Sequence, residues 1–406
     1  MNYTVTNAQI KEKYELALKR IREFHLRNIA NSPGPVVLIS TAYPGVWLEH
    51  AFDGVCWGQL NRDDETQKRV AVNQLRLFID NQLANGHLPY NVLDTELLKQ
   101  KPWWGRRQIG YKQLQECVSF ARLCLDAYEL VGDRKFLQTA YAACKGWDAW
   151  LCANRMTLGQ GLVETFCVYD TGHDNSCRLE GLPNGCPDVE GTAHEDIGGL
   201  PLISPDVNAV FYGDRIALSE MAEKLGYAKE SADWKQKAES VRRRMFGVLY
   251  DEATDFFYDA DKSLAQRKIK SISITNVFTE HMLTQAEFDR IYERHMLSPQ
   301  EFGSEYPFPS VALDDSARFT HADKNCWGYY SQALTLLRAQ RWMDFYGRSG
   351  DYDRILEKWI SVYAAQDEIL FSQEIDPYTG VPTDCSRWYS SAMLAYIYGV
   401  KRLGLV

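Results

Sequence analysis

Apolar residues recur at three- and four-residue steps along most of this 406-residue chain, which is the spacing of one buried face of a helix. The clearest example is the segment 111–131, whose apolar face carries Leu114, Cys117, Val118, Ala121, Cys124, Leu125 and Tyr128. The same spacing predicts further helices over residues 7–29, 65–85, 134–153, 206–225, 228–246, 284–297, 327–347, 351–367 and 387–402. The pattern therefore predicts an all-α chain.

Short glycine turns join three pairs of neighbouring helices, at residues 131–133, 225–227 and 349–351. Glycine readily adopts the left-handed conformation that ends a helix, and Asp133 and Asp351 can cap the helices that follow. Tight turns of this kind produce antiparallel helical hairpins. We therefore expect the chain to be built from such hairpins.

The opposite ends of the hairpins are joined by long connections, over residues 31–64, 86–110, 154–205, 298–326 and 368–386. Connections longer than about 15 residues are usually functional or disordered, and their many Trp, Tyr, Pro and acidic residues favour function. Short turns on one side and long connections on the other predict a closed ring of hairpins with a site on one face. No change in composition marks a boundary, so residues 1–406 are expected to form one domain, with a minor β-hairpin at 248–259.

The chain has 54 acidic and 45 basic residues, and its net charge is −9. Nucleic acids and anionic membranes favour clustered basic residues, so neither is an expected partner. No apolar stretch approaches the roughly 20 residues that cross a bilayer, and residues 1–7 lack the pattern of a secretory signal. The ten cysteines form no Cys-x-x-Cys pair, and we interpret them as reduced thiols of a cytoplasmic protein.

Residues 164–206 form the most acidic part of the chain, with nine acidic residues and one basic residue, Arg178. Clustered carboxylates raise one another's pKa, which suits a general acid at neutral pH. A calcium loop or a solvated acidic loop fits the same spacing, so the charges alone leave catalysis and these structural roles open.

Three other segments place aromatic residues beside acidic or polar ones. They are residues 371–380 with Arg387 and Trp388, residues 47–57, and residues 85–90 with Trp103 and Trp104. Aromatic rings stack on the apolar faces of sugars, while carboxylates and amides bind sugar hydroxyls. These segments are therefore candidates for a sugar site, whereas the helical Trp147, Trp150 and Trp359 are expected in the core.

In sequence order, these motifs resemble those of a glycosidase group. Residues 171–178 resemble the Ser-Gly-x-Asp-x-Ser-x-Arg signature of trehalases and its counterpart in processing α-glucosidase I (glycoside hydrolase family 63) and mannosylglycerate hydrolase. Four more blocks are similar to the group's motifs: 49–52, 206–209, 309–315 with 325–327, and 374–380. The blocks follow the group's order, so the resemblance covers nearly the whole chain.

The resemblance implies an (α/α)6 barrel and an inverting glycosidase. The long loops on one face favour a pocket that takes chain ends, so exo action is expected, and no cofactor is expected. The resemblance also implies that Asp174 is the general acid and Glu374 the general base, and that the substrate is a short α-glucoside or α-mannoside. Inversion requires the two carboxyl groups about 6.5–9.5 Å apart, with room for a water. The chain departs from the group at Cys177 and at residues 328–330, so the sugar and the linkage stay open.

The motifs also define candidate residues for binding a small oligosaccharide or glycoside. They are Trp47, Glu49, His50, Asp53, Trp57, His87, Trp103, Trp104, Tyr169, Asp170, His173, Asn175, Arg178, Asp206, Asn208, Trp327, Arg387 and Trp388. No His-Glu-x-x-His or similar spacing occurs, so no metal is expected, and structural hydrogen bonds are expected for His173 and His194. The oligomeric state is not predicted.

Three alternatives are kept. A sugar isomerase or epimerase on a similar barrel needs paired histidines on barrel helices, but His173 and His194 lie in predicted loops. A uronide-acting hydrolase or lyase would use Arg106, Arg107 or Arg387 to bind a substrate carboxylate. A carbohydrate-binding protein without catalysis explains the aromatic residues but not the acidic segment together with Glu374.

Overall fold

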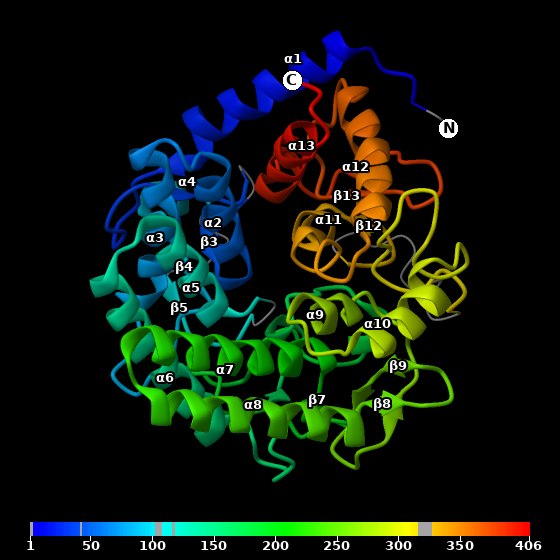
Figure 1. The fold of residues 1–406 in the computed structure, drawn as a ribbon. Helices are drawn as coiled ribbons and strands as arrows, with labels where there is room; N and C mark the ends of the chain where they lie inside the picture. Colours follow the sequence, from blue (N-terminus) through cyan, green and yellow to red (C-terminus); the bar gives the residue numbers. More distant parts are fainter. Residues whose placement is uncertain (1–2, 41–42, 102–107, 116–117, 316–326) are drawn as a thin grey trace.

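The fold is known from a computed structural model that describes residues 3–40, 43–101, 108–115, 118–315 and 327–406. Its helices form two concentric rings (Figure 1). The inner ring consists of α2 (Ala51–Leu60), α5 (Phe120–Val131), α7 (Pro205–Leu225), α9 (Ile274–Thr279), α11 (Ala333–Arg338) and α13 (Ser390–Arg402). The outer ring consists of α1 (Asn7–Arg20), α3 (Glu65–Ile79), α6 (Arg134–Asn154), α8 (Ala228–Val248), α10 (Gln285–Ile291) and α12 (Ser349–Ala364).

Contacts between neighbouring helices close the inner ring. Helix α2 packs on α5, α5 on α7 and α7 on α9, while α11 packs on α13 and α13 returns to α2. Each inner helix alternates along the chain with an outer one, as in the tightly packed pairs α2–α3 and α7–α8. The predicted (α/α)6 barrel is therefore confirmed.

Glycine turns connect several hairpins as the sequence predicts. Gly132 and Gly226 adopt left-handed conformations at the ends of α5 and α7, and Asp133 accepts hydrogen bonds from the first N–H groups of α6. The third turn was placed wrongly. Gly347 has the positive φ, whereas Gly350 and Asp351 belong to the first turn of α12, where Asp351 is not the N-cap.

Short strands support the loops of one face. The predicted hairpin is confirmed as β8 (Tyr250–Asp251) paired with β9 (Phe256–Phe257). Four other small sheets among the described residues were not predicted. Two have two strands each: β1 (Leu26–Arg27) with β2 (Val36–Val37), and β12 (Ser331–Gln332) with β13 (Glu374–Ile375). A third consists of β3 (Gly45–Trp47), β4 (Asn91–Leu93) and β5 (Ile109–Gly110), and the fourth of β6 (Glu164–Thr165), β7 (Leu202–Ile203), β10 (Asp259–Ala260) and β11 (Gln266–Arg267). All these pairs are antiparallel.

Several predicted helix boundaries are wrong. Residues 51–60 form α2, whereas the sequence predicted an irregular connection. The prediction failed because residues 51–58 are all buried, so the segment has no polar face to mark it as a helix. Residues 111–115 lie outside a helix, and α5 begins only at Phe120. Helices α4 (Thr95–Gln100) and α9 were not predicted, and α11 is much shorter than the predicted 327–347.

The core lies between the two rings. Trp147, Trp150 and Trp359 are buried there, as predicted. None of the helices within the described ranges has both the length and the apolarity that crossing a membrane requires. Cys385 is disulfide-bonded, so the expectation that all cysteines are reduced thiols is wrong at this position.

Candidate active site

A cavity of about 450 Å³ opens on the face that carries the long loops. This volume falls within the roughly 300–1,000 Å³ of small-molecule sites. We call it the loop-face cavity. Its lining consists of Ile39, Tyr43, Trp47, Glu49, His50, Tyr90, Asn91, Leu93, Gly110, Tyr111, Lys112, Gln113, Gln115, Tyr169, Gly172, Asp174, Val189, Trp327, Gln373 and Tyr389. Aromatic and amide side chains predominate, as a neutral polar ligand requires.

The sheet β3–β4–β5 holds one wall of this cavity. Trp47 on β3 pairs with Asn91 on β4, and Asn91 pairs in turn with Gly110 on β5. The Trp47 ring packs edge-on against Tyr43, with 5.3 Å between the ring centroids. Three strands from two of the long connections thus place rings and an amide beside one another.

Asp174 lines the cavity from the acidic segment. Burial raises the pKa of its carboxyl group to about 7, and the nearby charge of Glu374 adds to this shift. A carboxyl group with this pKa holds a proton in about half of the molecules at neutral pH. Asp174 therefore has the protonation behaviour of a general acid.

Glu374 lies on β13 and is fully buried, next in the chain to Gln373, which lines the cavity. Its Oε1 atom accepts a hydrogen bond from the Trp327 backbone N–H at 2.7 Å and another from Gln332 Nε2 at 2.6 Å. Gln332 is in place because it pairs directly with Glu374 in the β12–β13 register. Two donors on one oxygen fix the orientation of this carboxylate.

Trp327 lines the cavity and stacks on His173, which does not line it, with ring centroids 4.1 Å apart. Arg178 Nη2 lies 3.2 Å from His173 Nδ1. Since a guanidinium only donates, Nδ1 is the acceptor and Nε2 carries the ring proton. Burial and the neighbouring arginines keep the pKa of His173 well below its usual value, so the ring is neutral. Trp327 has a φ of 74°, which turns its N–H toward Glu374.

Buried ion pairs hold the acidic segment on the barrel. Arg178 binds Asp206 at the start of α7, and its Nη1 atom donates to Asp259 at 2.7 Å. Asn208 bonds both the N–H and the C=O of Val163. The loop that carries Asp174 is thus tied to α7 and β10, which restricts where the acid can point.

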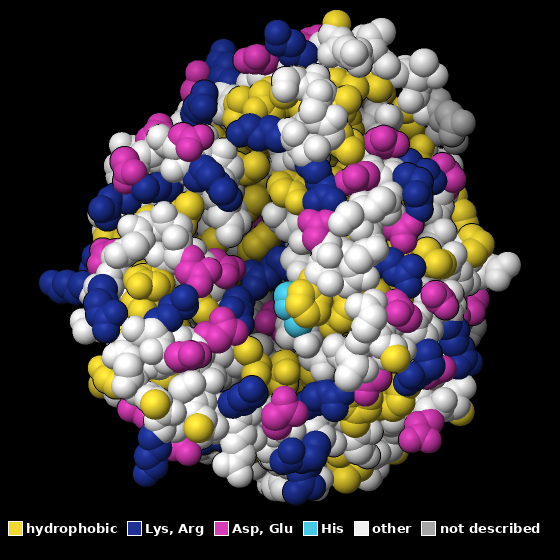
Figure 2. All heavy atoms as spheres, in the orientation of Figure 1, with side chains coloured by type: hydrophobic (Ala, Val, Ile, Leu, Met, Phe, Trp, Pro, Cys, Tyr) yellow, Lys and Arg dark blue, Asp and Glu magenta, His cyan; other side chains and the backbone are white. Residues whose placement is uncertain are grey.

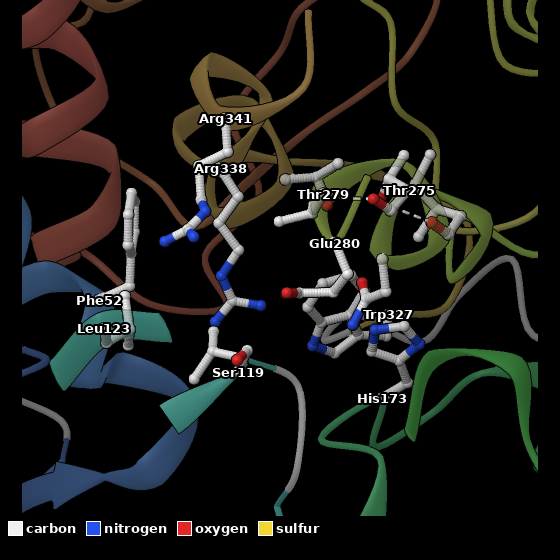
Figure 3. Close-up of a pocket in the computed structure, with 14 residues that line it drawn as sticks. Phe52, Ser119, Leu123, His173, Thr275, Thr279, Glu280, Trp327, Arg338 and Arg341 are labelled. Atoms are coloured by element: carbon white, nitrogen blue, oxygen red, sulfur yellow. Dashed lines mark hydrogen bonds between the residues drawn. The ribbon is translucent and has the colours of Figure 1, made fainter. Parts of the chain in front are cut away.

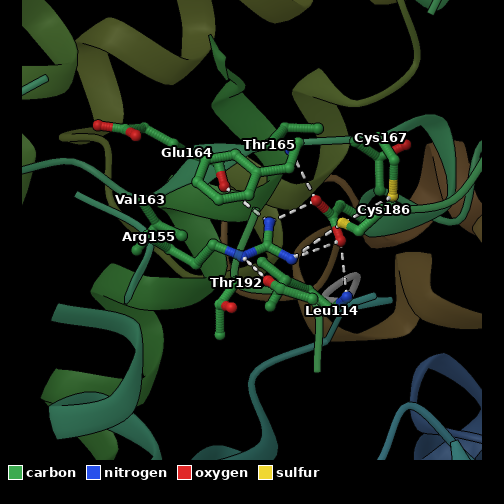
Figure 4. Close-up of polar contacts among 12 residues, drawn as sticks. Leu114, Arg155, Val163, Glu164, Thr165, Cys167, Cys186 and Thr192 are labelled. Carbon is green, nitrogen blue, oxygen red and sulfur yellow. Dashed lines mark hydrogen bonds and ion pairs between the residues drawn. The ribbon is translucent and has the colours of Figure 1, made fainter. Parts of the chain in front are cut away.

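A second anchor joins Arg155 to Asp170, both fully buried (Figure 4). Arg155 donates to both carboxylate oxygens, at 2.5 and 3.2 Å, and the N–H groups of Leu114 and Phe166 each donate at 2.7 Å. Arg155 also donates to the C=O of Gly191 at 2.8 Å. These bonds join three parts of the chain behind the loop-face cavity.

Replacing Asp170 by Ala is expected to lower stability by about 3–5 kcal/mol, because it leaves the Arg155 charge buried without its partner. Denaturant unfolding would measure this loss. The double variant Asp170→Leu with Arg155→Met removes both charges and should recover much of it. Equal stability of Asp170→Ala and the wild-type chain would show that the pair does not hold the fold.

Glu49 and His50 line the cavity beside Asp174. Burial raises the pKa of Glu49 to about 8, which Arg338 opposes and Asp174 reinforces. His50 Nε2 lies 2.6 Å from the Tyr389 hydroxyl, and burial keeps its pKa well below the usual value. At neutral pH this group therefore offers a largely protonated carboxyl and a neutral imidazole.

The structure brings six of the candidate residues to the cavity: Trp47, Glu49, His50, Tyr169, Asp174 and Trp327. A further group does not line the cavity but is joined to Trp327, directly or through one another: His173, Arg178, Asp206 and Glu374. Trp103 and Trp104 lie outside the described residues. Asn175 follows Asp174 but does not line the cavity.

Other candidates lie away from the cavity lining. Asp53 accepts hydrogen bonds from Ser390 and Ser391, and Trp57 donates to Gln67 at 2.8 Å. His87 stacks on Trp150 at 3.7 Å within the core. Arg387 is exposed and pairs with Asp384, and Trp388 lies against Arg20. Asp170 and Asn208 serve the anchors described above. These side chains have structural partners, so the prediction that they contact substrate is not supported by their position.

Sequence reasoning missed much of the lining: Tyr43, Asn91, Tyr111, Lys112, Gln113, Gln115, Gln373 and Tyr389. Residues 111–115 were assigned to a helix, so their exposure to a cavity was not considered. Tyrosine and glutamine cluster at residues 111–115, shortly after Trp103 and Trp104, and this cluster is the sequence signal that could have indicated a ligand-binding wall.

One group of metal-ligating residues lies close together among the residues that the structure describes: Cys167, Asp170 and Cys186. Both oxygens of Asp170 are already bonded to Arg155. Cys186 Sγ donates instead to Cys167 Sγ at 3.7 Å. The donor set is therefore engaged in holding the loop and does not fit a metal site.

A helical double ring with two carboxyl groups and aromatic rings at one end is compatible with a glycoside hydrolase of the (α/α)6 class. The family model "Mannosylglycerate hydrolase MGH1-like glycoside hydrolase domain" matches residues 65–391. The chain therefore belongs to this family of glycoside hydrolases, as the sequence motifs predicted. No curated protein matches the chain.

Solved structures show the same fold at low identity. The GH63 mannosylglycerate hydrolase from Thermus thermophilus, in complex with glucose, is 17% identical with a TM-score of 0.72, and the match covers 95% of this chain and 99% of that one. Neutral trehalase Nth1 from Saccharomyces cerevisiae is 12% identical with a TM-score of 0.64, covering 99% of this chain and 80% of that one. The rhamnosidase from Klebsiella oxytoca, with rhamnose bound, is 11% identical with a TM-score of 0.60, covering 100% of this chain and 66% of that one.

Proposed function

We propose that this glycoside hydrolase is an inverting, exo-acting enzyme that removes one sugar from a short α-glucoside or α-mannoside. Asp174 is the general acid and Glu374 the general base. The proposal rests on the contrast between these two carboxyl groups. Burial favours the protonated form of Asp174, whereas Glu374 is held by two N–H donors.

In this mechanism Asp174 gives its proton to the glycosidic oxygen as the bond to the anomeric carbon breaks. Glu374 takes a proton from a water on the opposite face of the sugar, and that water adds to the anomeric carbon. The product therefore has the inverted configuration. Proton exchange with solvent restores Asp174 and Glu374 to their starting forms.

The lining of the cavity supports recognition of a chain end. Trp327, supported by the His173 ring that stacks on it, forms its base, and Tyr43 and Trp47 offer apolar faces to a sugar ring. Glu49, with a pKa of about 8, can donate its proton to a sugar hydroxyl or accept one from it. A cavity closed at its base supports exo action.

Two observations weigh against the alternatives. His50 is the only histidine that lines the described cavity, whereas an isomerase needs a pair. Among the described residues, Lys112 is the only Lys or Arg in that lining, and Arg387 pairs with Asp384 away from it. The described residues therefore lack the clustered cations that a uronide site requires, while Arg106 and Arg107, the other candidates for such a site, lie outside the described residues.

A proton NMR time course on an α-glycoside tests the stereochemistry. The substrate panel is a set of α-linked glucosides and mannosides that includes mannosylglycerate, the substrate named for the structural relative. The β-anomer of the released sugar should appear first and then mutarotate. Initial release of the α-anomer would refute inversion, and no release from any substrate would refute the proposed substrate class.

A further inference from the structure

A second cavity of about 450 Å³ lies at the other end of the barrel. Figure 2 shows this face hollowed near its centre, with basic, acidic and apolar side chains around the hollow. The lining comes from α2, α5 and α7, from the end of α9 and from the residues that follow α9 and α11: Phe52, Gln59, Arg122, Asp126, Tyr212, Gly213, Ile216, Glu220, Thr279, Glu280, His281, Gln340 and Arg341. We call it the turn-face cavity.

The turn-face cavity continues inward along the barrel axis. A narrow extension shares Phe52, Thr279, Glu280 and Arg341 with it and ends at the His173–Trp327 pair (Figure 3). Trp327 also lines the loop-face cavity. The stacked rings therefore separate the two cavities, so a molecule in the turn-face cavity would be distinct from the glycoside undergoing hydrolysis.

Glu280 is a buried carboxyl group of this cavity, and the opposite charges near it, Arg341 and Arg122, already bind other carboxylates. Its side chain is 8% exposed, and its carboxylate makes no hydrogen bond to any part of the chain that the structure describes. A Cβ atom at Gly213 would lie 1.9 Å from Glu280 Oε2, so glycine makes room for this carboxylate. Figure 3 shows Glu280 and Arg338 pointing into the same space.

The arginines of this cavity already have acidic partners. Arg122 donates to both oxygens of Glu220, at 2.7 and 2.6 Å, and Arg341 donates to Asp126 at 3.1 Å. An anionic ligand would therefore face Glu280 and the two partner carboxylates, while a cation would face the guanidinium groups. A neutral molecule with several hydroxyl groups suits this lining, because each hydroxyl both donates and accepts.

The protonation of Glu280 agrees with a neutral ligand. Burial raises its pKa to about 7, although Arg341 and Arg122 oppose the shift. Near neutral pH its carboxyl group therefore accepts hydrogen bonds in one form and donates one in the other. Phe52 and Ile216 add apolar surface for the C–H groups of the same ligand.

We propose that the turn-face cavity is a second binding site, which takes a small neutral polyol such as a monosaccharide, with Glu280 bonding its hydroxyl groups. This inference does not depend on the proposed reaction or on its two carboxyl groups.

Crystals of the full chain soaked separately in D-glucose and D-mannose test the proposal, together with equilibrium dialysis of the same two labelled sugars. The wild-type protein should hold one of these sugars in the turn-face cavity in addition to any in the loop-face cavity. Glu280→Leu should lose the turn-face sugar alone and reduce the number bound by one per chain. Glu280→Gln keeps a hydrogen-bonding group, so its affinity should fall by no more than about ten-fold.

Thermal unfolding controls for folding of the variants. Removing a buried carboxyl group that has no hydrogen bond should leave the melting temperature of Glu280→Leu unchanged or higher. Glycoside hydrolysis by this variant should continue, which separates the present proposal from the proposed reaction. Water alone in the wild-type cavity, an ion there in place of the sugar, or an unchanged number of sugars in Glu280→Leu would each overturn it.

Discussion

Asp174→Asn is expected to slow the hydrolysis of unactivated alkyl glycosides by about a hundred- to ten-thousand-fold. Asparagine keeps the size of the side chain but has no acidic proton to give to the departing oxygen. The leaving alkoxide is a strong base, so the bond breaks slowly without that proton. Steady-state kinetics on wild-type and variant enzyme measure the loss, which should lie in kcat more than in KM.

The size of the Asp174 effect should depend on the leaving group. A dinitrophenyl glycoside of the same sugar leaves as a weakly basic anion that needs little protonation. Asp174→Asn should therefore hydrolyse this substrate far better, relative to wild type, than it hydrolyses the alkyl glycoside. Equal losses on both substrates would remove Asp174 from the role of general acid.

The pH dependence of the hydrolysis rate provides a second test of proton donation by Asp174. With a pKa of about 7, Asp174 is protonated below neutral pH and ionised above it. Hydrolysis of the alkyl glycoside should therefore decline as the pH rises through 7, and this decline should be absent for the dinitrophenyl substrate in Asp174→Asn. Glu195→Gln, an exposed change in the same acidic segment, is the matched control and should leave both profiles unchanged.

The outer helices were predicted well because each buries one face only. Residues 134–153 and 228–246 correspond closely to α6 and α8, which have exposed polar faces and the spacing that local pattern detects. Helix α2 was missed for the opposite reason, since residues 51–58 are buried throughout. Burial on every side thus removed the periodic signal at α2, although the inner helices α7 and α13 were predicted at residues 206–225 and 387–402.

The acid and base were proposed because charged residues in aromatic loops are conspicuous, and because the surrounding motifs resemble a family. The rest of the cavity was not found, since residues 111–115 continue the apolar spacing of α5. Their backbone is instead fixed from a distance, by the bond from the Leu114 N–H to Asp170. Such a contact, across 56 residues, leaves no trace in local periodicity.

Burial also gives different roles to residues of the same type that have similar neighbours in the sequence. His50 and His87 both lie beside aromatic residues in long connections, yet His50 lines the cavity and His87 stacks on Trp150 in the core. Asp170 and Asp174 are four residues apart. Asp170 is neutralised by Arg155, whereas Asp174 reaches the cavity with its pKa raised. Only the packing of distant segments makes these distinctions.

Glu374→Ala is expected to lower kcat by about a hundred- to ten-thousand-fold on alkyl and dinitrophenyl glycosides alike. The variant has no group to take a proton from the attacking water, and a better leaving group does not supply one. This equal loss distinguishes the base from the acid. The same kinetic comparison on the two substrates measures it, and a loss confined to the alkyl glycoside would contradict the role of Glu374.

Azide provides the matching rescue experiment. It is an anion that needs no base, and the shortened side chain leaves space for it where the water would attack. Azide should therefore accelerate Glu374→Ala on the dinitrophenyl substrate and give a glycosyl azide of inverted configuration. A glycosyl azide of retained configuration would place the missing carboxylate on the other face of the sugar.

Gln332→Leu tests whether the hydrogen bonds to Glu374 orient the base. Gln332 Nε2 holds Glu374 Oε1 at 2.6 Å, and the Trp327 N–H holds the same atom from the side of the cavity. Losing one of the two donors should lower kcat by about ten-fold, equivalent to one hydrogen bond to a charged group, with little change in KM. Because the carboxylate remains, azide should give no acceleration in this variant. If azide rescued Gln332→Leu as well as Glu374→Ala, the base would be lost in both variants, and Gln332 would do more than orient Glu374.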